Sequence, residues 1–145
     1  MTLFTSEKNK KAVLRTLIIY AGVTAFVALF GGVYEFFSHN VYSAAMVFAW
    51  RYPLILGVGI YAGIYFIPTK KVPGLLPACA YHFGVAMATV RAIFIGVIDI
   101  YGTTNVSMVN TYTILAWLFI IPSVAIYLFI LIYWTVKKDQ KVETE

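Results

Sequence analysis

Charged residues are scarce in this chain of 145 residues: Asp, Glu, Lys and Arg make up only 12% of it, while 61% of the residues are hydrophobic. A water-soluble domain of ordinary composition has about 25% charged residues. The sequence also contains a single cysteine, Cys79, which excludes an internal disulfide and a two-thiol redox relay within the chain. The shortage of charge, with a mean hydropathy of +0.84, predicts an integral membrane protein.

The hydrophobic residues are gathered in four long runs. We expect helices at about 12–37, 43–67, 75–101 and 111–136. Each run exceeds the roughly 20 residues that a helix needs to cross about 30 Å of hydrocarbon. The segment "IPTKKVPG" separates the second run from the third, and its prolines prevent one continuous helix there. The predicted fold is all-α, a single transmembrane domain (1–145) in which four helices form a bundle.

The formal net charge of +5 comes from basic residues at particular places in the chain. They precede the first run, separate the second from the third and follow the fourth: Lys8, Lys10, Lys11, Arg15, Lys70, Lys71, Lys137, Lys138 and Lys141. The two other connections, 38–43 and 102–110, contain no lysine or arginine. This alternation is typical of the positive-inside rule and predicts a multi-pass protein of the cell membrane with both termini in the cytoplasm. The basic residues then orient the protein in the lipid bilayer, and we expect no nucleic-acid partner.

Two segments of the sequence resemble each other. "GVYEFFSHNVYS" (32–43) aligns with "GVIDIYGTTNVS" (96–107), and the alignment matches Glu35 with Asp99. Each segment ends an odd-numbered run and precedes a run with a tryptophan and then a proline. These matches predict a duplicated helical hairpin, with two parallel repeats related by an axis along the membrane normal. Glu35 and Asp99 should then approach each other near the bundle axis.

Four ionisable residues lie within or at the edge of the predicted spans: Glu35, Arg51, Arg91 and Asp99. A single charge near the bilayer centre costs at least about 2.5 kcal/mol, so charges there are expected to pair. Contacts of Glu35 with Arg91, or of Asp99 with Arg51, would join different helices. One interpretation is a structural ion-pair network; the other is an outward-facing polar pocket that binds a ligand or ion. Tyrosines would surround that pocket, among them Tyr34 and Tyr101.

The two histidines raise the questions of metal and haem. Glu35 and His39 are four residues apart, on one face of a helix, and with Asp99 they offer three ligands for a divalent metal. The set is incomplete, so ordinary hydrogen bonding is the competing interpretation of His39. His82 lies about 12 Å above the inner end of its helix and His39 about 30 Å, too far apart to bind one iron. Two interpretations of His82 therefore remain. It binds haem, alone or between subunits, or it is a buried histidine that forms ordinary hydrogen bonds.

The stretches "GVYEFFSHNVYS" and "GVIDIYGTTN" resemble segments of small, uncharacterised four-helix membrane proteins of Gram-positive bacteria. The resemblance covers these two segments only. It implies a bacterial cytoplasmic membrane and carries no activity with it.

No catalytic set is present in the sequence, which lacks a phosphate-binding glycine loop and a nucleophile–histidine–acid arrangement. We therefore expect a non-enzymatic protein that binds or transports a small solute or ion, or serves as the membrane subunit of a larger system. Its predicted ligand-binding residues are Glu35, His39, Arg51, Arg91 and Asp99, with His82, Tyr34 and Tyr101 as secondary candidates. The alternative is a haem- or quinone-binding membrane anchor. No cofactor is predicted for the leading hypothesis, and a homodimer or partner membrane subunits stay open.

Overall fold

The computed structural model describes residues 3–38, 41–66, 75–103 and 106–142, and it is helical throughout these ranges apart from short turns. In chain order the elements are α1 (Leu3–Phe36), α2 (Ala44–Val47), the π-helix η1 (Pro53–Gly59), α3 (Ile60–Phe66), α4 (Leu75–Tyr101) and α5 (Val106–Val142). The predicted all-α class is confirmed.

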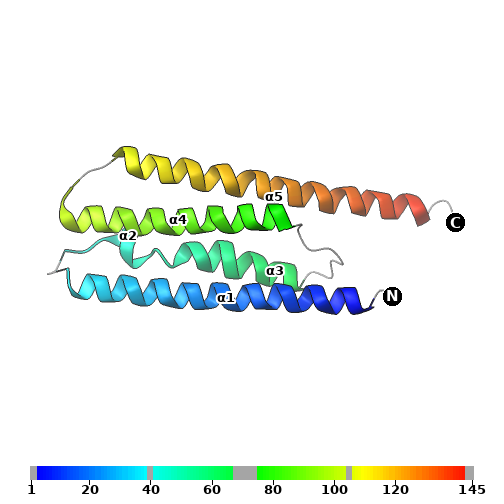
Figure 1. Cartoon of the computed structure of the whole chain (residues 1–145), viewed down its shortest axis with the longest axis horizontal. Coiled ribbons are helices and arrows are strands. Elements are labelled where there is room, and N and C mark those ends of the chain that lie inside the picture. Colours follow the sequence, from blue (N-terminus) through cyan, green and yellow to red (C-terminus); the bar gives the residue numbers. More distant parts are fainter. Residues whose placement is uncertain (1–2, 39–40, 67–74, 104–105, 143–145) are drawn as a thin grey trace.

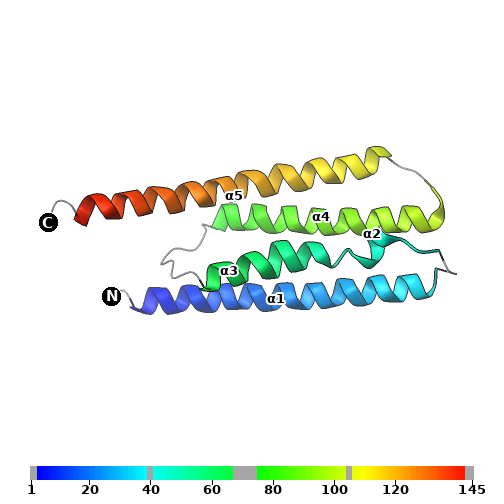
Figure 2. The ribbon, with the colours of Figure 1, turned by 180° about the vertical axis from the view of Figure 1, so that it is seen from behind.

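The helices lie side by side along one long axis (Figure 1). The α2–η1–α3 segment lies between α1 and α4, and α5 packs along the other side of α4 (Figures 1 and 2). Both termini lie at the same end of the molecule, and the connections that follow α1 and α4 lie at the opposite end (Figure 1). We call the end that holds these two connections the distal end.

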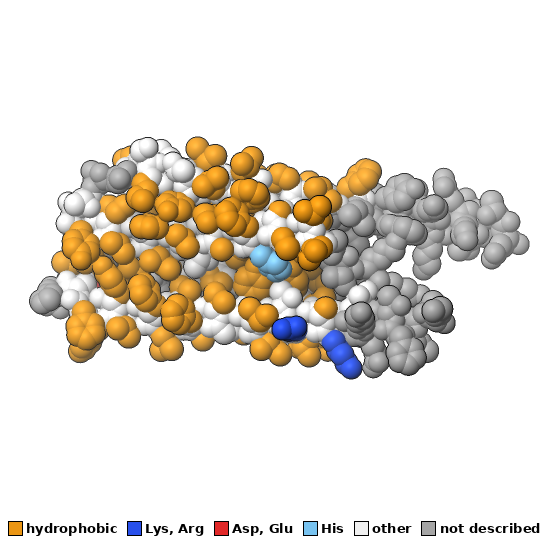
Figure 3. All heavy atoms as spheres, viewed as in Figure 1, with side chains coloured by type: hydrophobic (Ala, Val, Ile, Leu, Met, Phe, Trp, Pro, Cys, Tyr) orange, Lys and Arg blue, Asp and Glu red, His pale blue; other side chains and the backbone are white. Residues whose placement is uncertain are grey.

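Within the part of the chain that the structure describes, three helical stretches are long and apolar enough to cross a membrane: Asn9–Phe36, Leu75–Tyr101 and Val106–Ile126, of 28, 27 and 21 residues. Their surfaces expose large hydrophobic side chains, such as Leu29, which is 70% exposed. Figure 3 shows hydrophobic side chains over most of one face, with Lys and Arg side chains gathered toward the end that holds the termini. An apolar surface of this extent indicates a membrane protein.

The bounds of the long helices differ from the predicted ones mainly at polar ends. Helix α4 has the predicted range, 75–101, whereas α1 begins at Leu3 and α5 extends from Val106 to Val142. The added residues contain neither proline nor glycine and include several lysines, which favour helix. Hydropathy alone therefore located the apolar part of each helix but not its full length.

The second predicted helix, 43–67, is not continuous in the structure. Helix α2 ends after one turn, residues 48–50 form turns, and η1 begins at Pro53. Proline has no N–H and its ring clashes with the carbonyl four residues earlier, which disfavours a regular helix through this region. Within η1, the Leu56 carbonyl accepts a hydrogen bond of 2.6 Å from the Tyr81 hydroxyl. In α5, by contrast, the helix continues through Pro122, so the two predicted repeats differ here and the duplication stays a prediction.

Glycines allow close packing around α2. Met46 in α2 is 0% exposed and lies against Gly31 of α1 and Gly96 of α4. A Cβ atom on Gly31 would lie 2.8 Å from the Met46 carbonyl oxygen, and one on Gly96 would lie 2.9 Å from the Met46 Cα. Only glycine leaves room for the α2 backbone on both sides, so these two positions fix α2 between α1 and α4.

Replacing Gly96 by alanine tests this packing. We expect Gly96→Ala to destabilise the protein by about 1–3 kcal/mol, because overpacking against backbone atoms forces the helices apart. The matched control is Gly22→Ala in α1, where an added Cβ has no atom within 4 Å and should stabilise the helix by about 0.5–1 kcal/mol. The measurement is the thermal midpoint by circular dichroism in detergent. Equal midpoints for the two variants would contradict the proposed close contact.

Candidate functional site

The two predicted acidic residues meet at one serine at the distal end. The Ser43 backbone N–H donates a hydrogen bond of 2.8 Å to Glu35 Oε1, and the Ser43 hydroxyl donates one of 2.8 Å to Asp99 Oδ2. Glu35 lies in the last turn of α1, Asp99 lies in the last turn of α4, and Ser43 is the N-cap residue of α2. We call Glu35, Ser43 and Asp99 the serine junction. It brings the two acids together as the repeat predicts.

Ser43 occupies this place for a local reason. Serine is a preferred N-cap residue because its hydroxyl accepts from a backbone N–H in the first turn, here that of Met46 at 3.5 Å. The side chain is only 2% exposed. Since one hydroxyl both caps α2 and donates to a carboxylate on α4, the start of the broken segment is tied to α4 as well as to α1.

The arginines do not join the acids. Among the described residues neither Arg51 nor Arg91 forms an ion pair, so the predicted contacts of Glu35 with Arg91 and of Asp99 with Arg51 are absent there. Arg91 Nε instead donates to the Thr113 hydroxyl on α5. The physical reason is that Ser43 supplies both acids with hydrogen-bond donors, and Arg91 lies eight residues before Asp99, about 12 Å along α4.

Both arginines line one cleft between the broken segment, α4 and α5. Its volume is about 400 Å³, and its aromatic lining residues are Phe48, Tyr52 and Trp117. The Arg51 guanidinium carbon lies 3.8 Å from the centre of the Phe48 ring, a cation–π contact. We call this the arginine cleft. It divides the predicted site in two, because the acids lie in the serine junction and the bases line the cleft.

His82 forms a further polar centre, separate from the serine junction and the arginine cleft. It lies nearer the end of the molecule that holds the termini. The Tyr20 hydroxyl lies 2.7 Å from His82 Nδ1, and the Tyr61 hydroxyl lies 3.2 Å from His82 Nε2. The three side chains come from α1, α3 and α4. Both ring nitrogens therefore have a tyrosine partner, as expected for a hydrogen-bonded histidine, but the side chain is partly rather than fully buried. A haem iron could bind His82 only if a tyrosine moved away.

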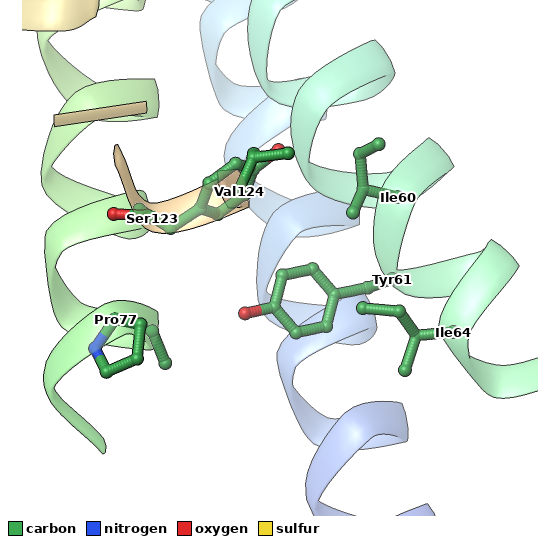
Figure 4. A pocket seen from close by; sticks show the side chains of 8 residues that line it. Ile60, Tyr61, Ile64, Pro77, Ser123 and Val124 are labelled. Carbon is green, nitrogen blue, oxygen red and sulfur yellow. The ribbon is translucent and has the colours of Figure 1, made fainter. Parts of the chain in front are cut away.

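A small cavity lies beside this histidine centre. Figure 4 shows the Tyr61 ring extending from α3 toward α4, with Ile60 and Ile64 on the same helix. Pro77 of α4 and Ser123 of α5 also line this cavity, which has a volume of about 40 Å³. One water would fit by size, but the Ser123 hydroxyl already donates to its own helix, to the Phe119 carbonyl at 2.6 Å. The cavity is therefore a packing gap rather than a site for a solute.

The other predicted residues have the following places. His39 lies outside the described residues, so the Glu35–His39 metal site cannot be compared with the structure. Within the described residues, no group of three His, Cys, Asp or Glu side chains is arranged to hold a metal ion. Tyr34 lies near the end of α1 and Tyr101 is the last residue of α4, and neither lines the arginine cleft.

Several participants were not found by reading the sequence. Ser43 carried a usable signal, since a serine directly before an apolar helical run is a typical N-cap. Tyr20, Tyr61 and Thr113 carried none, because their partners His82 and Arg91 lie 62, 21 and 22 positions away.

Comparison of the chain with protein-family models, with curated proteins and with solved structures gives no match. The geometry of the serine junction, the arginine cleft and the His82 centre is therefore the basis for inferring a function.

Replacing Ser43 tests the serine junction. In Ser43→Ala the Met46 N–H loses its cap and the Asp99 carboxylate loses a donor, and we expect a loss of about 0.5–2 kcal/mol in stability. The control is Ser123→Ala: this serine is also buried, at 4% exposure, but its hydroxyl bonds only to its own helix α5, so its loss should cost much less stability. Denaturant titration in detergent measures both. An equal effect of the two substitutions would refute the bridging role of Ser43.

Proposed function

We propose that this chain is a four-span protein of the cell membrane that binds a small anionic solute in the arginine cleft. In this proposal the α2–η1–α3 segment is the fourth span, beside the three long apolar helices. It runs alongside α1 and α4 between the two ends of the molecule (Figure 2), although it is broken.

The lysines support an orientation with both termini in the cytoplasm. Basic residues precede the first apolar run and follow the last one, at the end of the molecule where both termini lie (Figure 1). By the positive-inside rule this end faces the cytoplasm. The serine junction then faces outward, and the arginine cleft lies in the outer half of the membrane.

The observation that carries the proposal is the pair of guanidinium groups in one cleft without an ion-pair partner among the described residues. Positive charge within a membrane span is costly and is normally compensated. Arginine presents a planar set of N–H donors that matches a carboxylate or phosphate. An anion from outside the chain would compensate both groups, and their placement on two different elements would hold it from two sides.

The acids have a different role in this proposal. The sequence placed them among the predicted ligand-binding residues, but their contacts with Ser43 favour a structural task near the ends of α1 and α4. Discontinuous helices beside a solute site are typical of membrane transporters, which favours transport of the anion. Presentation of the anion to a partner subunit is the other form of the same function. A haem- or quinone-binding anchor has less support, because tyrosines engage both nitrogens of His82.

Ligand-induced stabilisation of the purified protein tests anion binding. In zwitterionic nanodiscs, benzoate, hexanoate and phosphate are compared with choline, a cation. A ligand at 100 times its dissociation constant stabilises the folded state by about 2.7 kcal/mol, so at least one anion should raise the thermal midpoint by several degrees. Choline should leave it unchanged.

The variants assign the effect to the cleft. Arg51→Gln combined with Arg91→Gln should abolish the shift, whereas Arg15→Gln, which removes an exposed charge on α1, should preserve it. If the double variant does not fold, Arg51→Gln alone gives the comparison, because Arg51 has no side-chain hydrogen bond among the described contacts. Stabilisation by choline alone, or an undiminished anion effect in the arginine variants, would refute the proposal.

A further inference from the structure

The side chains that line the arginine cleft indicate the chemical class of the ligand as well as its charge. Apart from the two arginines, the lining side chains have no charge, and they include Ile55, Leu56, Ile95 and Trp117. A fully hydrated ion such as sulfate would leave these apolar surfaces without matching contacts. A ligand with one anionic group and an apolar body would satisfy both parts of the lining.

The cleft is also open on the lipid-facing surface. Ile55 and Trp117, which line it, are 60% and 55% exposed, and both belong to helices whose outer surface is apolar. In a bilayer these exposed side chains meet acyl chains. A ligand dissolved in the bilayer can therefore reach the cleft sideways, without passing through the serine junction at the distal end.

The depth of Arg91 in the membrane limits the choice of anionic group. Arg91 lies about 12 Å along α4 from Asp99, and Asp99 is the residue near the distal end of that helix. An ionised group is very costly in hydrocarbon, but a carboxylic acid can enter it in the protonated, neutral form. A phosphodiester or sulfate has no neutral form near neutral pH. On binding, the carboxyl group gives its proton to water, and the carboxylate accepts hydrogen bonds from the arginines.

The volume limits the apolar body. About 400 Å³ is near the lower end of the range of roughly 300–1,000 Å³ for small-molecule sites. This space suits one chain or one ring system rather than a two-chain phospholipid with its headgroup.

We infer that the ligand of the arginine cleft is an amphiphilic monocarboxylic acid that enters from the bilayer. This inference rests on the proposed anion-binding function and adds the chemical class and the route. The juxtaposition that carries it is Arg51 and Arg91 beside Ile55 and Trp117 in one laterally open cleft.

Saturable binding of radiolabelled decanoate to the full chain in phosphatidylcholine nanodiscs tests the inference, with empty nanodiscs as background. Decanoate should half-saturate at an aqueous concentration at least about tenfold below that of acetate, because the bilayer and the apolar walls both favour its chain. Decanol, which has the chain without the charge, should not displace decanoate. Dioleoylphosphatidylglycerol added to the nanodiscs should not displace it either.

A matched pair of variants locates the binding. Ala45 lines the cleft and Ala44, its neighbour in α2, does not. Ala45→Phe should fill the space and weaken decanoate binding by at least about tenfold, while Ala44→Phe should leave it unchanged. If Ala45→Phe does not fold, a second pair of variants is used, Trp117→Ala with Leu118→Ala as its control. Trp117 lines the cleft and Leu118 does not, so only Trp117→Ala should weaken decanoate binding.

The outcomes separate the two proposals. If acetate binds as tightly as decanoate, or if the phospholipid displaces decanoate, the amphiphilic monocarboxylate is wrong while anion binding stands. If decanol displaces decanoate as well as decanoate itself does, charge is irrelevant and the inference is wrong. If no anion binds the protein at all, the proposed function itself fails.

Discussion

The organisation of the molecule depends on one buried serine that holds the ends of two long helices together. Ser43 donates through its backbone to Glu35 on α1 and through its side chain to Asp99 on α4. Ser43 is itself buried, whereas Glu35 is partly buried and Asp99 is exposed, so the serine joins its two partners at the edge of the bundle. The glycines at 31 and 96 let α2 come close enough for both bonds to form. A short piece of helix thereby fixes the spacing between α1 and α4.

This arrangement separates the opposite charges. Because neutral donors satisfy the acids, the arginines have no acidic partner in the described chain and line a cleft of their own. A network of four mutually neutralised side chains would have been inert toward solutes. The observed separation gives the acids a structural task, and in the proposed function it leaves the bases to attract an anion.

The break in the second helix matters for the same reason. A regular helix from Ala44 onward would satisfy its own backbone groups and present a smooth surface. The turn at 48–50 and the π-helix that follows widen the segment beside α4, where the cleft lies. The carbonyl of Leu56 is satisfied by Tyr81, so the irregular backbone is supported by a neighbouring helix. π-Helical turns are frequent at functional sites, and here one forms part of the candidate site.

The sequence by itself determined the properties that depend on composition and on short spacing. Hydropathy located the apolar helices, α4 to the residue, and the local match of Glu35 with Asp99 predicted that these acids would come together. The tertiary structure alone decided which hydrogen-bond partners Asp99 and Arg91 have, because Ser43 lies 56 positions from Asp99 and Thr113 lies 22 positions from Arg91. Hydrogen bonds of this kind depend on how helices face one another, which a one-dimensional pattern does not contain. A proline alone does not determine where a helix breaks, since the segment before Pro53 is irregular whereas Pro122 stands inside a continuous helix.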